Sequence, residues 1–187
     1  MNVNRLLPLH LAKPPAASSR SFAYMAWSSA LMNSNQRALW QEALRGAALE
    51  VFDALLGVCP EPAAADLAIP QFTAMVGLAG DLRGVMSISC SKATAVEMTR
   101  RMLQSDCTAE AQIWDALGEV CNVLAGRFKN GPPRIADHCV LSVPTVIAGS
   151  NYSQHSAGGS GTVKQCYRMR DEMILITLTV NECRAGH

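Results

Sequence analysis

The sequence contains few aromatic residues and almost no net charge, and these two shortages exclude whole classes of partner. Aromatic residues make up 5% of the 187 residues, which leaves little surface on which nucleic-acid bases could stack. Lysine and arginine number 16 against 15 acidic residues, so the net charge of +1 does not favour nucleic acid or an acidic membrane. No uninterrupted apolar run reaches the ~20 residues that a membrane-spanning helix needs.

The sequence also lacks the motifs of self-contained catalytic sites. It has no C-x-x-C pair, no G-x-S-x-G and no glycine-rich phosphate loop. Seven cysteines are an odd number, and several fall in expected strands or helices, where cysteine behaves as a small apolar residue. The four histidines are scattered through expected loops and tails: His10, His138, His155 and His187. We therefore expect a reducing, cytoplasmic setting and no metal site.

What remains is a composition typical of one globular domain with a tail, since 49% of the residues are hydrophobic and 17% are charged. Residues 1–31 contain three basic residues and no acidic one, and they include a Lys-Pro-Pro stretch. Such a start resembles a targeting segment, but we interpret it as a flexible extension or as the product of an upstream start codon. The folded domain is expected over residues 32–187.

Local signals predict three helices and five strands. A helix is expected from Ser34 to Leu56, where Gly57 ends it, and a second one over residues 92–104. A third is expected from the cap residue Thr108 to Asn130, with Glu110 beside its N-terminal dipole. Gly80-Asp81 and residues 170–172 are expected to be hairpin turns. Strands are expected over residues 72–79, 83–91, 139–149, 162–169 and 173–181, and a mobile loop over residues 150–161.

The stretch Ile113–Asn130 has two unlike faces when it is placed on a helix. One face is apolar and should be buried; it carries Trp114, Leu117, Cys121, Leu124 and Phe128, flanked by Ile113 and Val120. The opposite face carries Asp115, Glu119, Asn122, Gly126 and Lys129, with Gly118 beside it. Glycine costs up to ~1 kcal/mol relative to alanine in a helix, so this face is not chosen for helix stability alone. A carboxylate and an amide one turn apart, beside glycines, suit docking onto a partner.

A plain solvated face explains the same residues, because a single E-x-x-N occurs by chance in many helices. The longer run G-E-V-C-N-V-L-A-G, however, resembles the E-x-x-N signature of the CheC/CheX chemotaxis phosphatases. The resemblance extends from about Met32 to about Asn181. It includes G-L-A-G-D-L-R-G at residues 77–84 and L-S-V-P-T-V-I-x-G at residues 141–149.

The resemblance implies a phosphatase that removes the phosphoryl group from a phosphorylated CheY-type response regulator. It implies that Asn122 orients the attacking water and that Glu119 pairs with a lysine of the receiver domain. It implies no cofactor of the protein's own, since the receiver supplies Mg²⁺. The fold that it implies is α+β, with the two long helices side by side on one face of a largely antiparallel sheet.

A short internal repeat suggests that the domain is duplicated. Glu50–Gly57 matches Glu119–Gly126, with Glu, Val, Leu and Gly at the same offsets on a helix each time. Members of the CheC/CheX group are similarly built from a repeated half, with pseudo-twofold symmetry. Asp53 stands where the first copy would need Asn, so only the second copy is expected to be active.

Two functions from different classes remain open. The chain is a phosphatase acting on a receiver, or it is an interaction module that binds a response regulator or a flagellar or sensory component without turnover. A metabolic enzyme with its own small-molecule pocket is a distant third. A homodimer is also expected, because the nearly uncharged stretch Met173–Val180 would be a pairing hazard at a sheet edge and because CheX-like proteins join subunits through their sheets.

Overall fold

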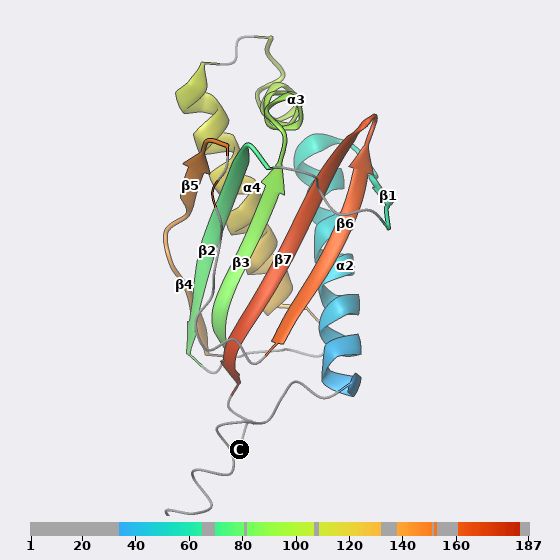
Figure 1. The fold of residues 1–187 in the computed structure, drawn as a ribbon, viewed down its shortest axis with the longest axis vertical. Coiled ribbons are helices and arrows are strands. Elements are labelled where there is room, and N and C mark those ends of the chain that lie inside the picture. Colours follow the sequence, from blue (N-terminus) through green and yellow to red (C-terminus); the bar gives the residue numbers. More distant parts are fainter. Residues whose placement is uncertain are drawn as a thin grey trace, which may run out of the picture. The chain divides into compact units, whose positions relative to one another are not determined.

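The computed structural model describes residues 34–64, 70–80, 82–106, 109–131, 138–150, 152 and 161–183. The expected extension over residues 1–31, the cap Thr108 and most of the expected loop over residues 150–161 lie outside these ranges. The elements in chain order are α2 (Ser34–Leu56), β1 (Glu61–Pro62), β2 (Phe72–Gly80), β3 (Leu82–Cys90), α3 (Lys92–Leu103), α4 (Glu110–Lys129), β4 (Cys139–Leu141), β5 (Thr145–Ala148), β6 (Gly161–Met169) and β7 (Glu172–Cys183) (Figure 1).

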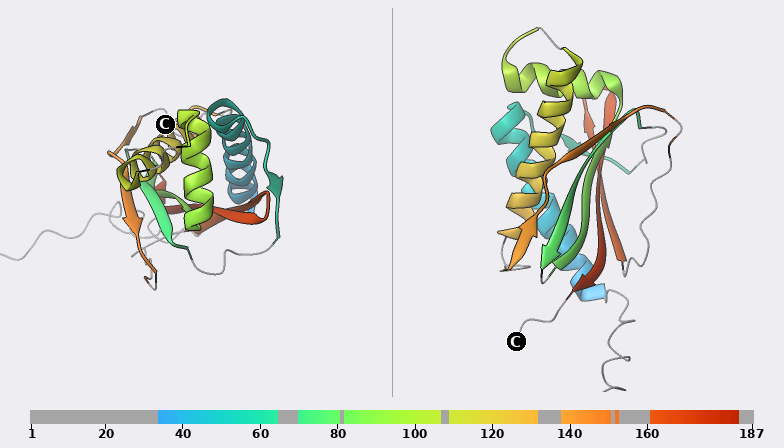
Figure 2. Two further views of the ribbon diagram at one scale, coloured as in Figure 1. Left: turned by 90° about the horizontal axis from the view of Figure 1, so that it is seen from above. Right: turned by 90° about the vertical axis from the view of Figure 1, so that its left-hand side faces the viewer.

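The strands form one antiparallel sheet, and the long helices cover one of its faces. The strand order is β1-β6-β7-β3-β2-β4, and β5 continues beside β2 after β4. Figure 2 shows α2 and α4 on the same side of this sheet, with α3 across one end. The expected α+β class is therefore confirmed, as are the side-by-side helices. Among the described residues, no helix is long and apolar enough to cross a membrane.

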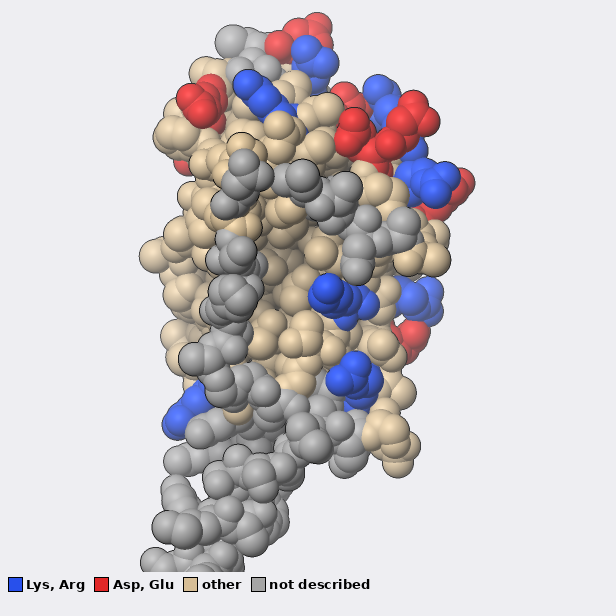
Figure 3. All heavy atoms as spheres, viewed as in Figure 1, with Lys and Arg blue, Asp and Glu red and all other residues tan. Residues whose placement is uncertain are grey.

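The core lies between the helices and the sheet, because alternate strand residues point to opposite faces. Even-numbered residues of β2, β3 and β7 are buried toward the helices, as Val76, Ile88 and Ile176 illustrate. The two helices supply the other half of the core from one stripe each: Leu44, Ala48 and Val51 from α2, and Leu117, Leu124 and Phe128 from α4. The opposite face of the sheet is mostly uncharged, and acidic side chains lie mainly toward its upper end (Figure 3).

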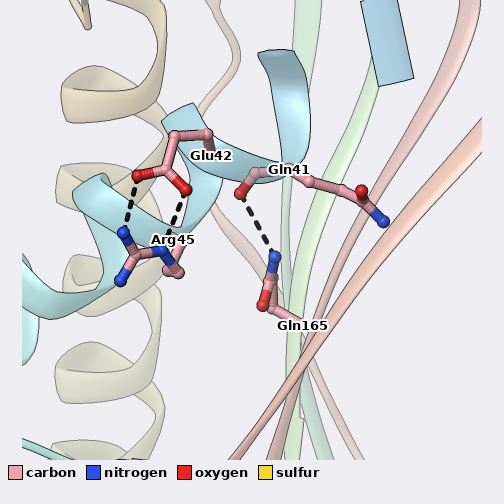
Figure 4. A network of polar contacts seen from close by, with 4 residues as sticks. All are labelled: Gln41, Glu42, Arg45 and Gln165. Carbon is pink, nitrogen blue, oxygen red and sulfur yellow. Dashed lines mark hydrogen bonds and ion pairs between the residues drawn. The ribbon is translucent and has the colours of Figure 1, made fainter. Parts of the chain in front are cut away.

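Polar contacts attach α2 to the far edge of the sheet. The Gln165 side-chain amide of β6 donates to the carbonyl of Gln41, at 3.1 Å (Figure 4). In the next turn Arg45 makes two hydrogen bonds to Glu42, which lower the pKa of that carboxyl. Gly57, at a φ of 61°, ends α2 as expected, and its N–H donates to the Asp53 carbonyl.

The sheet has the symmetry that a duplicated domain would have. In this symmetry β1 corresponds to the β4–β5 segment, β2 to β6 and β3 to β7. Replacing each strand by its counterpart gives the same strand order, read from the other end of the sheet. Strands β3 and β7 meet at the centre, and each half places its first strand beside the other half's hairpin. Among the described residues of the second half, helix α3 has no counterpart. The common origin of the halves stays a prediction, supported by this topology.

Three local expectations were wrong. The strand expected over residues 139–149 is two strands, because Ser142, Val143 and Pro144 interrupt it and proline cannot donate to a sheet ladder. The stretch Glu61–Pro62, which is not among the five expected strands, pairs with β6. Trp114, expected in the buried stripe, is 43% exposed. It lies in the second turn of α4, at the margin of the stripe.

Candidate functional site

Helix α4 carries the candidate residues, and contacts at both of its ends hold it in place. Its N-cap is Ala109, whose N–H donates to the side-chain oxygen of Gln112 at 2.8 Å. Near its C-terminal end the Lys129 ammonium donates to the Cys139 carbonyl of β4, also at 2.8 Å. Lys129 is therefore an anchor between α4 and the sheet edge, rather than part of an open face as the helical projection suggested.

A bulge in the sheet edge presses against the middle of α4. Leu141 is opposite Leu78 and Thr145 is opposite Met75, so the β4–β5 segment has one residue more than β2 over this interval. Ser142 stays in register: its N–H donates to the Gly77 carbonyl, and its hydroxyl accepts from the Gly77 N–H. Val143 and Pro144 therefore share the place opposite a single residue of β2, on the side of the sheet that faces α4.

Gly118 is where α4 receives this bulge. A Cβ atom on Gly118 would lie 3.3 Å from the Cβ of Pro144 and 3.7 Å from a methyl of Val146. Gly118 is buried, so its lack of a side chain serves a contact within the chain rather than the approach of a partner. The sequence reasoning missed Pro144; the signal for it was a proline inside an expected strand.

The remaining outer face of α4 is open. Glu119 and Asp115 are exposed, and Asn122 is half-buried. Neither Glu119 nor Asn122 has a side-chain hydrogen bond or an ion pair with another described residue. A Cβ atom on Gly126, one turn beyond Asn122, would meet nothing within 4 Å. The structure thus leaves this carboxylate and this amide available to a partner on the solvent side of α4.

The matching positions of α2 are exposed as well, but their surroundings differ. Glu50 has its carboxylate 3.9 Å from the Arg127 guanidinium of α4, an exposed and weak ion pair. Asp53 is exposed, and Gly57 ends α2 directly after this segment, whereas Gly126 lies inside α4. The first copy therefore offers a carboxylate in place of the amide, near a helix end.

Cys121, next to Asn122 in sequence, belongs to the core. Its thiol is within 3.5 Å of the Ala74 carbonyl and 3.8 Å of the Met86 carbonyl, to which it can donate. Burial raises the pKa of this thiol to about 12, so it stays protonated and does not act as a nucleophile. Within the ranges that the structure describes, no three His, Cys, Asp or Glu side chains cluster as metal ligands would.

A cavity of about 320 Å³ lies elsewhere, and no candidate residue lines it. It is formed by the segment after α2 together with Arg101, Arg168 and Arg170. Arg101 makes an ion pair with Glu97 and donates to the Leu56 carbonyl, and Arg170 approaches the same Glu97. These arginines join α2, α3 and the β6–β7 turn. The candidate site is thus an exposed helix face, which suits a macromolecular partner better than a small molecule.

The sequence matches the family described as chemotaxis phosphatase CheX over residues 72–166, just over half of the chain. The chain belongs to the CheX family. The matched region contains Glu119, Asn122 and the Pro144 bulge. A comparison with curated proteins found no match in sequence.

Solved structures of CheX and CheC-like proteins share the fold. The chemotaxis protein CheX from Vibrio vulnificus is 19% identical, with a TM-score of 0.68, over 79% of this chain and 99% of that one. The CheX–CheY–BeF3–Mg²⁺ complex from Borrelia burgdorferi matches at 20% identity and a TM-score of 0.62, covering 75% and 97%. Thermotoga maritima FliY matches at 12% identity and a TM-score of 0.58, covering 80% and 92%. At these identities the likeness concerns the fold.

Proposed function

We propose that this CheX-family protein hydrolyses the aspartyl phosphate of a CheY-type response regulator, with Asn122 orienting the attacking water and Glu119 pairing with a receiver lysine. One observation carries the proposal. Glu119 and Asn122 lie one turn apart on the solvent side of α4, within the region matched to the family, and neither has a side-chain partner among the described residues.

The chemistry requires little more than these two groups. Water attacks the phosphorus in line, the bond to the aspartyl oxygen breaks, and inorganic phosphate and the free carboxylate result. Because an acyl phosphate is already activated, the main need is a well-placed water. The Asn122 amide can accept from that water and donate to a neighbouring oxygen without bringing a negative charge near the phosphoryl group. Asp53, in the first copy, would bring that charge.

Glu119 has a different task in this proposal. Its exposed carboxylate would form a charge-assisted hydrogen bond with the receiver lysine and so hold α4 in the receiver's cleft. The metal would come from the receiver too: the similar Borrelia burgdorferi structure is a complex of CheX with CheY, BeF3 and Mg²⁺. We expect the reaction in the cytoplasm, in line with the reducing setting inferred from the cysteines.

The decisive experiment follows the lifetime of a phosphorylated CheY-type receiver from the source organism at saturating protein. Asn122→Ala should slow hydrolysis roughly 30- to 1000-fold, the equivalent of ~2–4 kcal/mol, because the water is no longer held. Glu119→Ala should also weaken binding of the receiver. The difference in affinity between this variant and wild type should shrink at high salt, because salt screens the wild-type contact. Neither change should alter the free energy of unfolding by more than ~0.5 kcal/mol, since both residues face solvent.

Asp53→Ala is the matched control, because it removes the side chain at the equivalent position of α2. It should leave the receiver lifetime as in wild type. If Asn122→Ala hydrolyses as fast as wild type while the receiver still binds, the helix is a docking surface and the interaction module is the correct function.

We also propose a homodimer, although the stretch Met173–Val180 cannot be its pairing edge. Met173–Val180 belongs to β7, which lies between β6 and β3 and is not an edge. The sheet ends at β4 and β5 on one side and at β6 on the other, where β1 pairs with Tyr167 and Arg168 and the Ala63 N–H donates to the Cys166 carbonyl. We propose β6 as the edge on which a second copy extends the sheet, because β1 pairs with only part of this strand.

A further inference from the structure

Two exposed apolar side chains flank the candidate site. Trp114 is 43% exposed and Val143 is 82% exposed, and they are among the few large hydrophobic residues exposed in the described part of the chain. Tryptophan is enriched among the residues that carry most of the binding energy of interfaces. The described fold leaves a large part of each side chain uncovered.

Trp114 lies about two turns before Asn122 on α4, turned by about 80° around the helix axis. Residues four apart on a helix share a face, so Trp114, Gly118, Asn122 and Gly126 form one row. At 1.5 Å per residue, Trp114 is about 12 Å from Asn122 along the axis. A standard interface covers about 800 Å² of each partner, a patch with a radius of about 16 Å. A partner centred on Asn122 therefore also covers Trp114.

Val143, at the edge of the sheet between β4 and β5, lies beside the same row of α4. Two contacts align this edge with α4: Pro144 against Gly118, and the Cys139 carbonyl with Lys129. Eleven residues of helix span about 16 Å, and the bulged segment from Cys139 to Pro144, opposite four residue steps of β2, spans about 13 Å, so the two segments run side by side over most of that length. Val143 precedes Pro144, on the side of the sheet that faces α4, and thus lies level with the interval between Gly118 and Asn122.

We propose that Trp114 and Val143 are the apolar anchors with which this surface binds the receiver domain. The proposal rests on the proposed function in naming the receiver as occupant, and the continuity of both side chains with Glu119 and Asn122 supports that choice. In this arrangement the polar pair reaches the phosphoryl group, while the apolar pair supplies binding energy at the periphery of the chemistry. The bulge acts as the positioning device for the wall beside Val143, because without its extra residue Pro144 would fall opposite Met75 and turn to the other face of the sheet.

The test is a binding titration with a CheY-type receiver from the source organism, activated by BeF3⁻ and Mg²⁺ so that no turnover occurs. Trp114→Ala is expected to weaken binding about 10-fold or more, and Val143→Ser several-fold, because hot-spot truncations cost more than 1 kcal/mol. Leu39→Ser is the control: Leu39 is 52% exposed on α2, away from α4's row. It should bind as wild type does.

Val143→Ser keeps the test valid if Trp114→Ala does not fold, since a side chain that is 82% exposed contributes little to the core. Affinities within about twofold of wild type for both variants would overturn the docking proposal. An equal loss in Leu39→Ser would overturn it too, because the effect would then be general. Binding without turnover is read separately from hydrolysis, so loss of the proposed phosphatase activity would leave this result interpretable.

Discussion

Neighbouring residues of α4 are buried or reach the surface according to the side of the helix on which they lie. Cys121 and Asn122 are neighbours in sequence, yet the thiol lies in the core while the amide reaches the surface. The difference is the 100° turn between consecutive helix positions, which separates a structural residue from a candidate catalytic one. The same turn places Glu119 at the surface beside the buried Val120.

The buried thiols predict how stability depends on pH. Burial raises the pKa of Cys90 and of Cys121 from 9.0 to about 12, so the folded state keeps protons that the unfolded state releases above pH 9. Stability is therefore complete below pH 9 and falls as the pH rises toward 12. Each thiol contributes a slope of up to ~1.4 kcal/mol per pH unit.

Urea unfolding between neutral and alkaline pH measures this slope. Cys121→Ala should make the slope shallower, whatever its effect on stability at neutral pH. Equal slopes for wild type and Cys121→Ala would show that burial does not raise the pKa of this thiol.

Among the elements, α4 combines a packing surface with an open one, and its glycines belong to different surfaces. Gly118 makes room for the Pro144 bulge, whereas Gly126 faces open space. Helix stability alone would favour alanine at Gly126. Keeping glycine there is consistent with a partner that approaches α4 closely.

Gly126→Ala should therefore stabilise the protein by up to ~1 kcal/mol while weakening receiver binding. Gly46→Ala is the matched change, since a Cβ atom on Gly46 of α2 also meets nothing within 4 Å. It should give a similar gain in the free energy of unfolding with unchanged binding. The comparison needs thermal unfolding and the BeF3⁻ receiver titration; equal affinity of the two variants would argue against close approach at Gly126.

At the scale of the whole molecule, the sheet decides how copies could assemble. Its most hydrophobic strand, β7, is paired on both sides, and only the ends of the strand order remain for a second chain. One edge consists of β4 and β5, of three and four residues, and the other is the nine-residue β6, where β1 pairs with Tyr167 and Arg168. A dimer built there would continue the sheet from one copy into the next.

Light scattering at tens of micromolar should give a mass near twice the 20.0 kDa of one chain. Dilution should lower this mass, because pairing along a single strand edge buries modest area. A monomer at the highest concentration would exclude the dimer without affecting the phosphatase proposal.

Much of the fold could be predicted because its signals are local. Gly57 ends α2, and Gly80 precedes the β2–β3 turn. Both positions have a positive φ, which glycine adopts at little cost. The burial of Leu117, Leu124 and Phe128 follows from their spacing. Trp114 failed the same reasoning, since a residue at the margin of an apolar stripe is buried only if another element covers it.

By itself, the sequence determined the helices, the hairpins and the placement of Glu119 and Asn122 one turn apart on a helix, because helical periodicity and turn chemistry act within a few residues. Only the tertiary structure decided what surrounds that pair. The extra residue opposite β2 brings Pro144 onto Gly118, leaves Val143 at the surface and turns the edge of the sheet into a wall of the site. Those contacts join segments more than twenty residues apart. They depend on the register of the β4–β5 segment against β2, which cannot be predicted from a local sequence pattern.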